Sequence, residues 1–137
     1  MKKRAVLFFA TAFLSGFALS EPVPDGVRAA ISNLSLQSWS LKEGSLRLVM
    51  DKPLVSPTFY STAVHLICGE QWQSPGAFQR MRLERIEVLN HLNAQGFALL
   101  DASNKCRELG KATGSSGETM IQAAAVRCEA GVCRKRD

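Results

Sequence analysis

The sequence predicts an α+β domain of two layers, in which one amphipathic helix packs on a small antiparallel or mixed sheet and disulfide bonds staple the layers together. Three observations support this class. Two runs of alternating apolar residues flank a short loop at residues 42–44, a clear amphipathic helix follows from residue 56, and short stretches suited to strands come after it. The expected order is β-β-α-β-β-β, with the helix against one face of a single sheet.

The first two strands are predicted from alternation of apolar and polar residues between residues 34 and 50. Residues 21–26 contain two prolines and a glycine, and we expect an extended lead-in there. Two alternating runs that are joined by a short glycine-containing loop are typical of a hairpin. The apolar positions, with one phase slip before the tryptophan, are Leu34, Leu36, Trp39, Leu41, Leu46, Leu48 and Met50.

The helix is predicted to start at Ser56-Pro57, with serine as the N-cap and proline at the first helical position. At 100° per residue the apolar side chains fall on one broad arc, and His65 falls on the polar side. Cys68 lies at the edge of the apolar arc. The helix should end between residues 69 and 72, before the turn at 74–76. The arc consists of Phe59, Tyr60, Ala63, Val64, Leu66, Ile67 and Cys68.

Residues 78–100 allow two interpretations. One long helix would align Phe78, Met81 and Val88 but would place Arg85 within the apolar face. A hairpin with strands near 86–88 and 97–99 uses the β-branched and aromatic residues better, and we favour it. The polar, glycine-rich stretch from Cys106 to residue 117 is expected to be a mobile loop. Residues 120–128 are interpreted as a last strand, with a short helix as the alternative.

The N-terminal residues predict export. Three basic residues (2–4) precede an apolar run at 5–14, and small residues occupy positions 18 and 20, which is the pattern of a secretory signal peptide. We therefore expect a signal peptide at 1–20, cleavage between Ser20 and Glu21, and a single exported domain at 21–137, with 118–137 as a cysteine-containing C-terminal extension. The apolar run is shorter than the roughly 20 residues of a membrane span. A lipoprotein would have cysteine at position 21, so no stable membrane anchor is expected.

The charge of the mature chain argues against nucleic acid as a partner. Loss of residues 2–4 lowers the formal net charge from +5 to +2. A nucleic-acid-binding domain would be expected to carry a basic stripe interleaved with aromatic residues. The only run of basic residues left is at 134–136, which we interpret as a solvated tail.

Four cysteines follow the signal peptide, at Cys68, Cys106, Cys128 and Cys133. An even number in a small exported domain predicts two disulfides with three possible connectivities. Cys128 and Cys133 can close a tight loop around a glycine, which would leave the other two to pair; the crossed pattern stays open. A zinc site would be expected to show C-x-x-C knuckles, which are missing, so no metal is predicted.

Several segments resemble a group of small exported proteobacterial proteins of unknown function. The similarity covers residues 34–111, and it implies a Cys68–Cys106 disulfide and no catalytic residue. It is carried by residues 50–53, 60–68, 86–90, 95–97 and 105–106.

No pattern of an enzyme is present in the mature sequence. Its two histidines, His65 and His91, form no metal-binding pair, and no nucleophile elbow or phosphate loop occurs. Glu84 and Glu87 would share a helical face but not a strand face. We therefore expect a periplasmic or secreted, non-enzymatic protein without cofactor that binds another protein or serves as an envelope accessory module. The alternative is a secreted inhibitor or host-directed factor that presents a disulfide-rigidified loop.

Overall fold

The computed structural model describes residues 21–135. The predicted signal peptide at 1–20 and the end of the tail at 136–137 lie outside these residues. The elements, in chain order, are α1 (Asp25–Ser32), β1 (Leu36–Lys42), β2 (Ser45–Met50), α2 (Pro57–Gln73), α3 (Pro75–Arg80), β3 (Arg85–Leu89), β4 (Gly96–Leu100), α4 (Ala102–Leu109), α5 (Ser116–Ala123), β5 (Ala125–Glu129) and β6 (Val132–Cys133).

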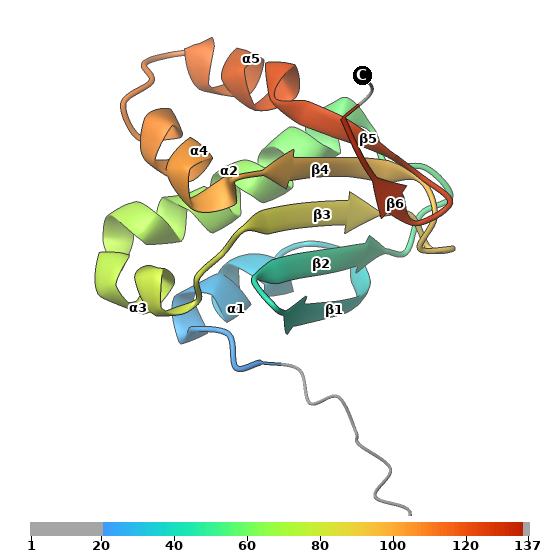
Figure 1. Cartoon of the computed structure of the whole chain (residues 1–137), viewed down its shortest axis with the longest axis horizontal. Coiled ribbons are helices and arrows are strands. Elements are labelled where there is room, and N and C mark those ends of the chain that lie inside the picture. Colours follow the sequence, from blue (N-terminus) through green and yellow to red (C-terminus); the bar gives the residue numbers. More distant parts are fainter. Residues whose placement is uncertain (1–20, 136–137) are drawn as a thin grey trace, which may run out of the picture.

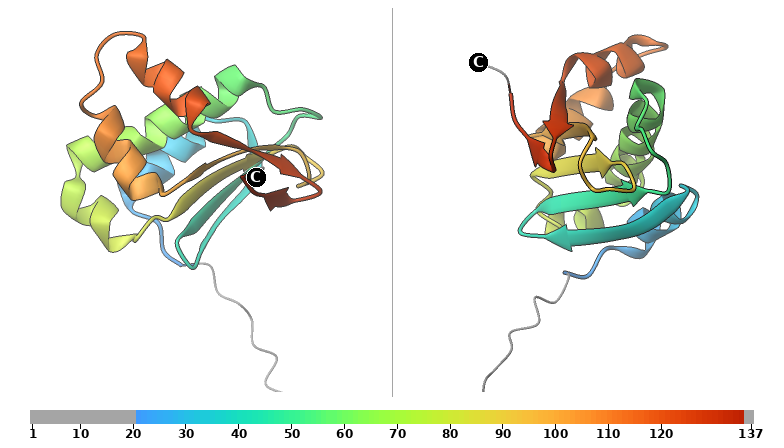
Figure 2. Two further views of the ribbon diagram at one scale, coloured as in Figure 1. Left: turned by 45° about the horizontal axis from the view of Figure 1, so that its top comes forward. Right: turned by 90° about the vertical axis from the view of Figure 1, so that its right-hand side faces the viewer.

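One mixed sheet of six strands organises the described chain. The strands lie in sequence order from β1 to β6, and every neighbouring pair is antiparallel except β2 and β3, which are parallel. The parallel pair needs a long connection, which α2 and α3 supply. Figures 1 and 2 show the helices gathered on one side of the sheet. The fold is therefore α+β, as the sequence predicts.

The two faces of the sheet are filled differently. Alternate residues of β2 and β3, such as Leu48 and Val88, point toward the helices and belong to the main core with Val64 and Ile67 of α2. The residues between them point to the opposite face, which we call the open face. There the sheet curls, and a small second cluster forms at its β4–β6 end, where the β5–β6 hairpin folds over (Figures 1 and 2). Its buried members are Leu89, Ala98, Cys128 and Cys133.

The predicted helix is confirmed as α2, except that Leu66, which belongs to the expected apolar arc, is exposed. The Ser56 side chain accepts a hydrogen bond from the Phe59 amide at 3.1 Å, and Pro57 occupies the first turn. His65 is exposed, while Cys68 is fully buried. The helix continues to Gln73, slightly past the expected end.

The expectation of a single packed helix is wrong. The sequence predicts an extended lead-in at residues 21–26 and no helix before the first strand, but residues 25–32 form α1, which buries Val27 and Ile31 one turn apart. The expected mobile loop contains the end of α4 and the start of α5, so only residues 110–115 lie between helices. Residues 120–128 are shared between α5 and β5. Helices this short take most of their stability from tertiary packing, and in a local pattern their few apolar residues are easily outweighed by polar ones.

The hairpin interpretation of residues 78–100 is confirmed in its strands. Arg85–Leu89 and Gly96–Leu100 pair antiparallel as β3 and β4. The preceding residues 75–80 form the short helix α3, which neither interpretation included. The expected order therefore lacks four of the described helices and one strand, because it has five strands where the sheet has six.

Tyr60 of α2 has a buried hydroxyl to which the described core offers no hydrogen-bond partner. The residue is 0% exposed, its ring centroid lies 5.5 Å from that of Phe97, and its hydroxyl has no hydrogen-bond partner among the described residues. Burial raises the pKa of the phenol well above its ordinary value. Since an unsatisfied buried hydroxyl costs free energy, Tyr60→Phe should raise the free energy of unfolding by about 1 kcal/mol. Urea denaturation of the two proteins measures this, and a lower midpoint for the variant would contradict it.

Candidate protein-interaction surfaces

Two disulfides fix the elements that carry the candidate surfaces. Cys68–Cys106 joins α2 to α4 across 38 residues, and both cysteines are 0% exposed. Cys128–Cys133 closes the β5–β6 hairpin, with 4.0 Å between the Cα atoms. The crossed pairing that the sequence left open does not occur. Two disulfides indicate an oxidising compartment outside the cytoplasm.

Three loops at one end of the sheet are tied to one another by hydrogen bonds. They are residues 51–55 after β2, residues 90–95 between β3 and β4, and the hairpin turn with Val132, residues 130–132; together we call them the loop end. In Figures 1 and 2 they lie side by side at the end of the sheet to which the β2 and β3 arrows point.

Asn90 and Gln95 make most of these ties. The Asn90 side chain donates to the Pro53 carbonyl at 2.9 Å and accepts from the amides of Ala94 and Gln95. The Gln95 side-chain oxygen accepts from the Val55 amide at 2.9 Å. The amide of His91 donates to the Lys52 carbonyl at 2.9 Å, and the amide of Gly131 donates to the Ala94 carbonyl at 2.9 Å. The backbone of the loop end is therefore cross-linked by hydrogen bonds.

Each loop of this end exposes one large apolar side chain. Leu54 and Leu92 are each 69% exposed, and Val132 is 45% exposed. The other exposed large apolar residues of the described chain, Leu66 and Trp72, lie on α2. Apolar residues scattered singly over a surface need no explanation, but a group on adjoining loops is typical of a contact site.

The hairpin that the second disulfide closes does not protrude. Cys128 and Cys133 are 1% and 6% exposed, and they pack on Leu89 and Ala98 of the open face. The turn has positive φ at Ala130 and Gly131, and its Gly131 amide is bonded to the neighbouring loop. The turn of this hairpin is therefore one part of the loop end and not a separate projecting loop.

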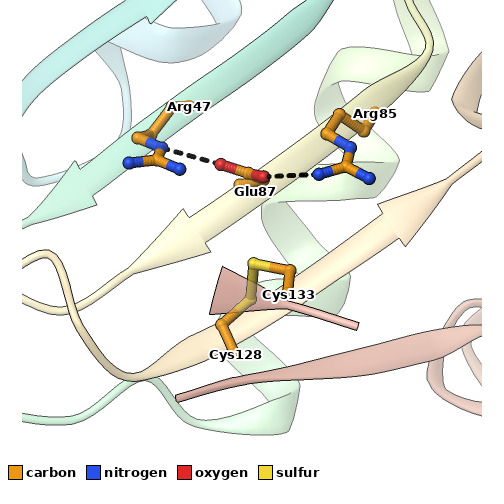
Figure 3. A network of polar contacts seen from close by, with 5 residues as sticks. All are labelled: Arg47, Arg85, Glu87, Cys128 and Cys133. Carbon is orange, nitrogen blue, oxygen red and sulfur yellow. Dashed lines mark hydrogen bonds and ion pairs between the residues drawn. A yellow bond between two sulfur atoms is a disulfide. The ribbon is translucent and has the colours of Figure 1, made fainter. Parts of the chain in front are cut away.

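Beside this disulfide, three charged side chains meet on the open face (Figure 3). The Arg47 Nε atom donates to Glu87 Oε2 at 2.7 Å, and an Arg85 terminal nitrogen donates to Glu87 Oε1 at 3.2 Å. The Glu87 side chain is only 3% exposed, while those of Arg47 and Arg85 are 35% and 39% exposed. A buried carboxylate therefore lies under two partly exposed guanidinium groups, which compensate its charge.

The histidines and carboxylates singled out in the sequence do not gather. His65 lies on α2, its ring 5.8 Å from that of Trp72, and lines a hollow of about 340 Å³ between α2 and α5. His91 lies at the loop end, its Nδ1 3.0 Å from the Lys52 carbonyl oxygen. Glu84 precedes β3, and Glu87 is held by the two arginines. Within residues 21–135 no cluster of three or more histidine, cysteine or acidic side chains could hold a metal ion.

The sequence predicted the disulfide cysteines, but it indicated neither the loop end nor the charged group on the open face. One local signal was present, because Arg85 and Glu87 are two residues apart and so share a face once β3 is extended to begin at Arg85. Arg47 is 40 residues away from Glu87, and only the parallel pairing of β2 with β3 brings them together. The loop end depends likewise on contacts between distant segments.

Among the described residues, no helix combines the length and apolar character needed to cross a membrane. The chain matches no protein-family model, no curated protein and no solved structure.

Proposed function

We propose that this chain is an exported, non-enzymatic protein-binding module of the cell envelope, and that the loop end is the surface that contacts its partner. The observation that carries the proposal is the exposure of Leu54 and Leu92, at 69% each, on two loops that are hydrogen-bonded to each other. Binding energy in protein interfaces concentrates in a few side chains that become buried on association.

The hydrogen bonds within the loop end support this role energetically. Ordering a flexible loop at an interface costs free energy that subtracts from the affinity. Asn90 and Gln95 hold two of the loops together before any partner arrives. The disulfide-closed hairpin, attached through Gly131, holds the third.

Site-specific photo-crosslinking in the producing bacterium tests the proposal. A photoreactive amino acid replaces Leu54 or Leu92 in separate variants, and Thr62 or Gln122 in matched controls on the exposed sides of α2 and α5. The two loop-end variants should give the same protein adduct, and the controls should not. Equal adducts from all four positions, or none from the loop end, would contradict the proposal.

One observation favours an alternative function, that of a secreted inhibitor or host-directed factor. Val132 is 45% exposed within the loop that Cys128 and Cys133 close. A rigid loop with an apolar side chain can be inserted into a pocket of a target protein. In that case the photoreactive group at Val132 alone should crosslink, and the adduct should form only after the protein leaves the producing cell.

A further inference from the structure

The open face of the sheet carries an excess of positive charge. The register of the strands places Lys42, Arg47 and Arg85 on this face, because their neighbours Leu41, Leu46 and Ile86 point into the main core. By the same alternation Glu87 is the only acidic residue that β1–β4 contribute to it. The acidic Glu84 and Asp101 line a hollow of about 530 Å³ beside Arg85, where the basic surface ends.

The Glu87 carboxylate lies beneath the guanidinium groups of Arg47 and Arg85 and is not available to a ligand. Both oxygens of Glu87 are taken, one by each arginine, and its side chain is 3% exposed. One guanidinium would suffice to neutralise this carboxylate, so the second leaves a surplus charge. A molecule that approaches the open face therefore meets arginine nitrogens first.

Most of the donors of these arginines have no protein partner. Arg47 uses only its Nε and Arg85 only one terminal nitrogen in contacts within the described part of the chain. Both groups bind the same carboxylate, as Figure 3 shows, which keeps them close together and oriented. Guanidinium groups held in this way form strong, directional hydrogen bonds with carboxylates.

We infer that the open face binds an acidic segment of a partner protein, with Lys42, Arg47 and Arg85 as the residues that contact its carboxylates. This inference rests on the proposed function, because it takes the occupant to be a protein. It adds the chemistry of the partner and a second contact surface. The hairpin of β5 and β6 borders both this face and the loop end, so one partner can reach the two surfaces.

The other anionic macromolecules fit this surface less well. Binding of single-stranded nucleic acid relies on aromatic side chains on which bases stack. By strand alternation the described strands place none on the open face, because Trp39 and Phe97 point to the helix side. A bilayer is flat, whereas the basic residues lie on a curled sheet beside a folded-over hairpin (Figure 2). A peptide chain can follow such a surface.

Fluorescence anisotropy with a labelled deca-glutamate peptide and its deca-glutamine counterpart tests the inference on the purified, disulfide-bonded protein. The variant Lys42→Gln/Arg85→Gln removes two charges from the open face and keeps the Arg47–Glu87 ion pair, so Glu87 stays compensated. The control Arg28→Gln/Lys111→Gln removes two charges from exposed residues of α1 and the stretch after α4. The net charge of the two variants is equal.

The wild-type protein should bind the glutamate peptide and not the glutamine peptide. Affinity should fall about tenfold in the open-face variant and stay within about twofold in the control. Equal losses in both variants, or no preference for glutamate, would overturn the inference. So would binding of phosphatidylglycerol vesicles or of oligothymidylate that depends on Lys42 and Arg85 while the glutamate peptide does not bind.

The same proteins separate this inference from the proposed function. If Leu54 and Leu92 still crosslink a partner while the glutamate peptide does not bind, the loop end is an interaction surface and the acidic partner is wrong. If the peptide binds at the open face and no crosslink forms at the loop end, the proposed use of the loop end fails and the acidic ligand stands.

Discussion

Replacement of Gly96 by alanine should abolish folding or lower the free energy of unfolding by about 4 kcal/mol or more. A Cβ atom at this position would lie 1.9 Å from the Val88 carbonyl oxygen and 3.0 Å from the Leu89 Cα atom. Both atoms belong to the backbone of β3, which pairs with β4, so neither can move without opening the hairpin. The small cluster under Cys128–Cys133 would open with it, because Gly96 is also the partner of Cys128 in β5.

The matched control is the same chemical change at Gly69. This residue lies within α2, and a Cβ atom there would meet nothing within 4 Å. Alanine favours the helix over glycine, so Gly69→Ala should raise the free energy of unfolding by about 0.5–1 kcal/mol. Urea denaturation, together with the yield of folded protein, measures both variants. Equal effects of the two substitutions on the free energy of unfolding would contradict the view that the close approach of Gly96 to the β3 backbone excludes a side chain.

The elements that the sequence predicts well are those whose signals are local. Ser56 and Pro57 start α2 by chemistry that acts within one turn, and the apolar arc of α2 extends over several turns. The β1–β2 hairpin combines alternation, interrupted by one phase slip in β1, with a turn at Glu43-Gly44, where both residues have positive φ. Such signals can be recognised in the sequence without knowledge of the rest of the fold.

The helices that were missed have weaker local signals. In α4 only Ala102, Cys106 and Leu109 are buried, and polar residues separate them. Their spacing of four and three residues is helical, so the pattern was present, although only the part from Cys106 onward lies in the stretch interpreted as loop. The N-cap position of α4 is Asp101, in the left-handed region at φ 54°, and its side chain makes no capping bond. The residue type of a helix start was therefore present in the sequence, although the capping bond that usually goes with it is not formed.

The candidate surfaces depend on pairings that no local pattern encodes. The sequence offers no means to know that β2 and β3 run parallel in a register that sets Arg47 beside Glu87. A shift of one residue would turn Glu87 into the core. The loop end likewise needs Asn90 and Gln95 to meet residues 53–55, some 40 positions earlier.

Removal of Cys68–Cys106 should destabilise the domain more than removal of Cys128–Cys133. The first disulfide closes a loop of 38 residues and the second a loop of only 5. On the chain-entropy model these loops correspond to about 4 and about 2 kcal/mol of stabilisation. The first disulfide also joins α2 to α4 in the main core, where both cysteines are 0% exposed, so alanine at these positions leaves a gap in close-packed surroundings.

The comparison uses two double variants, Cys68→Ala/Cys106→Ala and Cys128→Ala/Cys133→Ala, in urea denaturation under oxidising conditions. Alanine is preferable to serine, since a hydroxyl at these buried positions would add its own cost. The second variant should remain folded, because only the small cluster with Leu89 and Ala98 loses its cover. Its hairpin should loosen, however, and the crosslink yield from Val132 should change. If the Cys128–Cys133 variant proves the less stable of the two, loop length is not the dominant factor, and the packing of the hairpin on the open face contributes more than the main-core link.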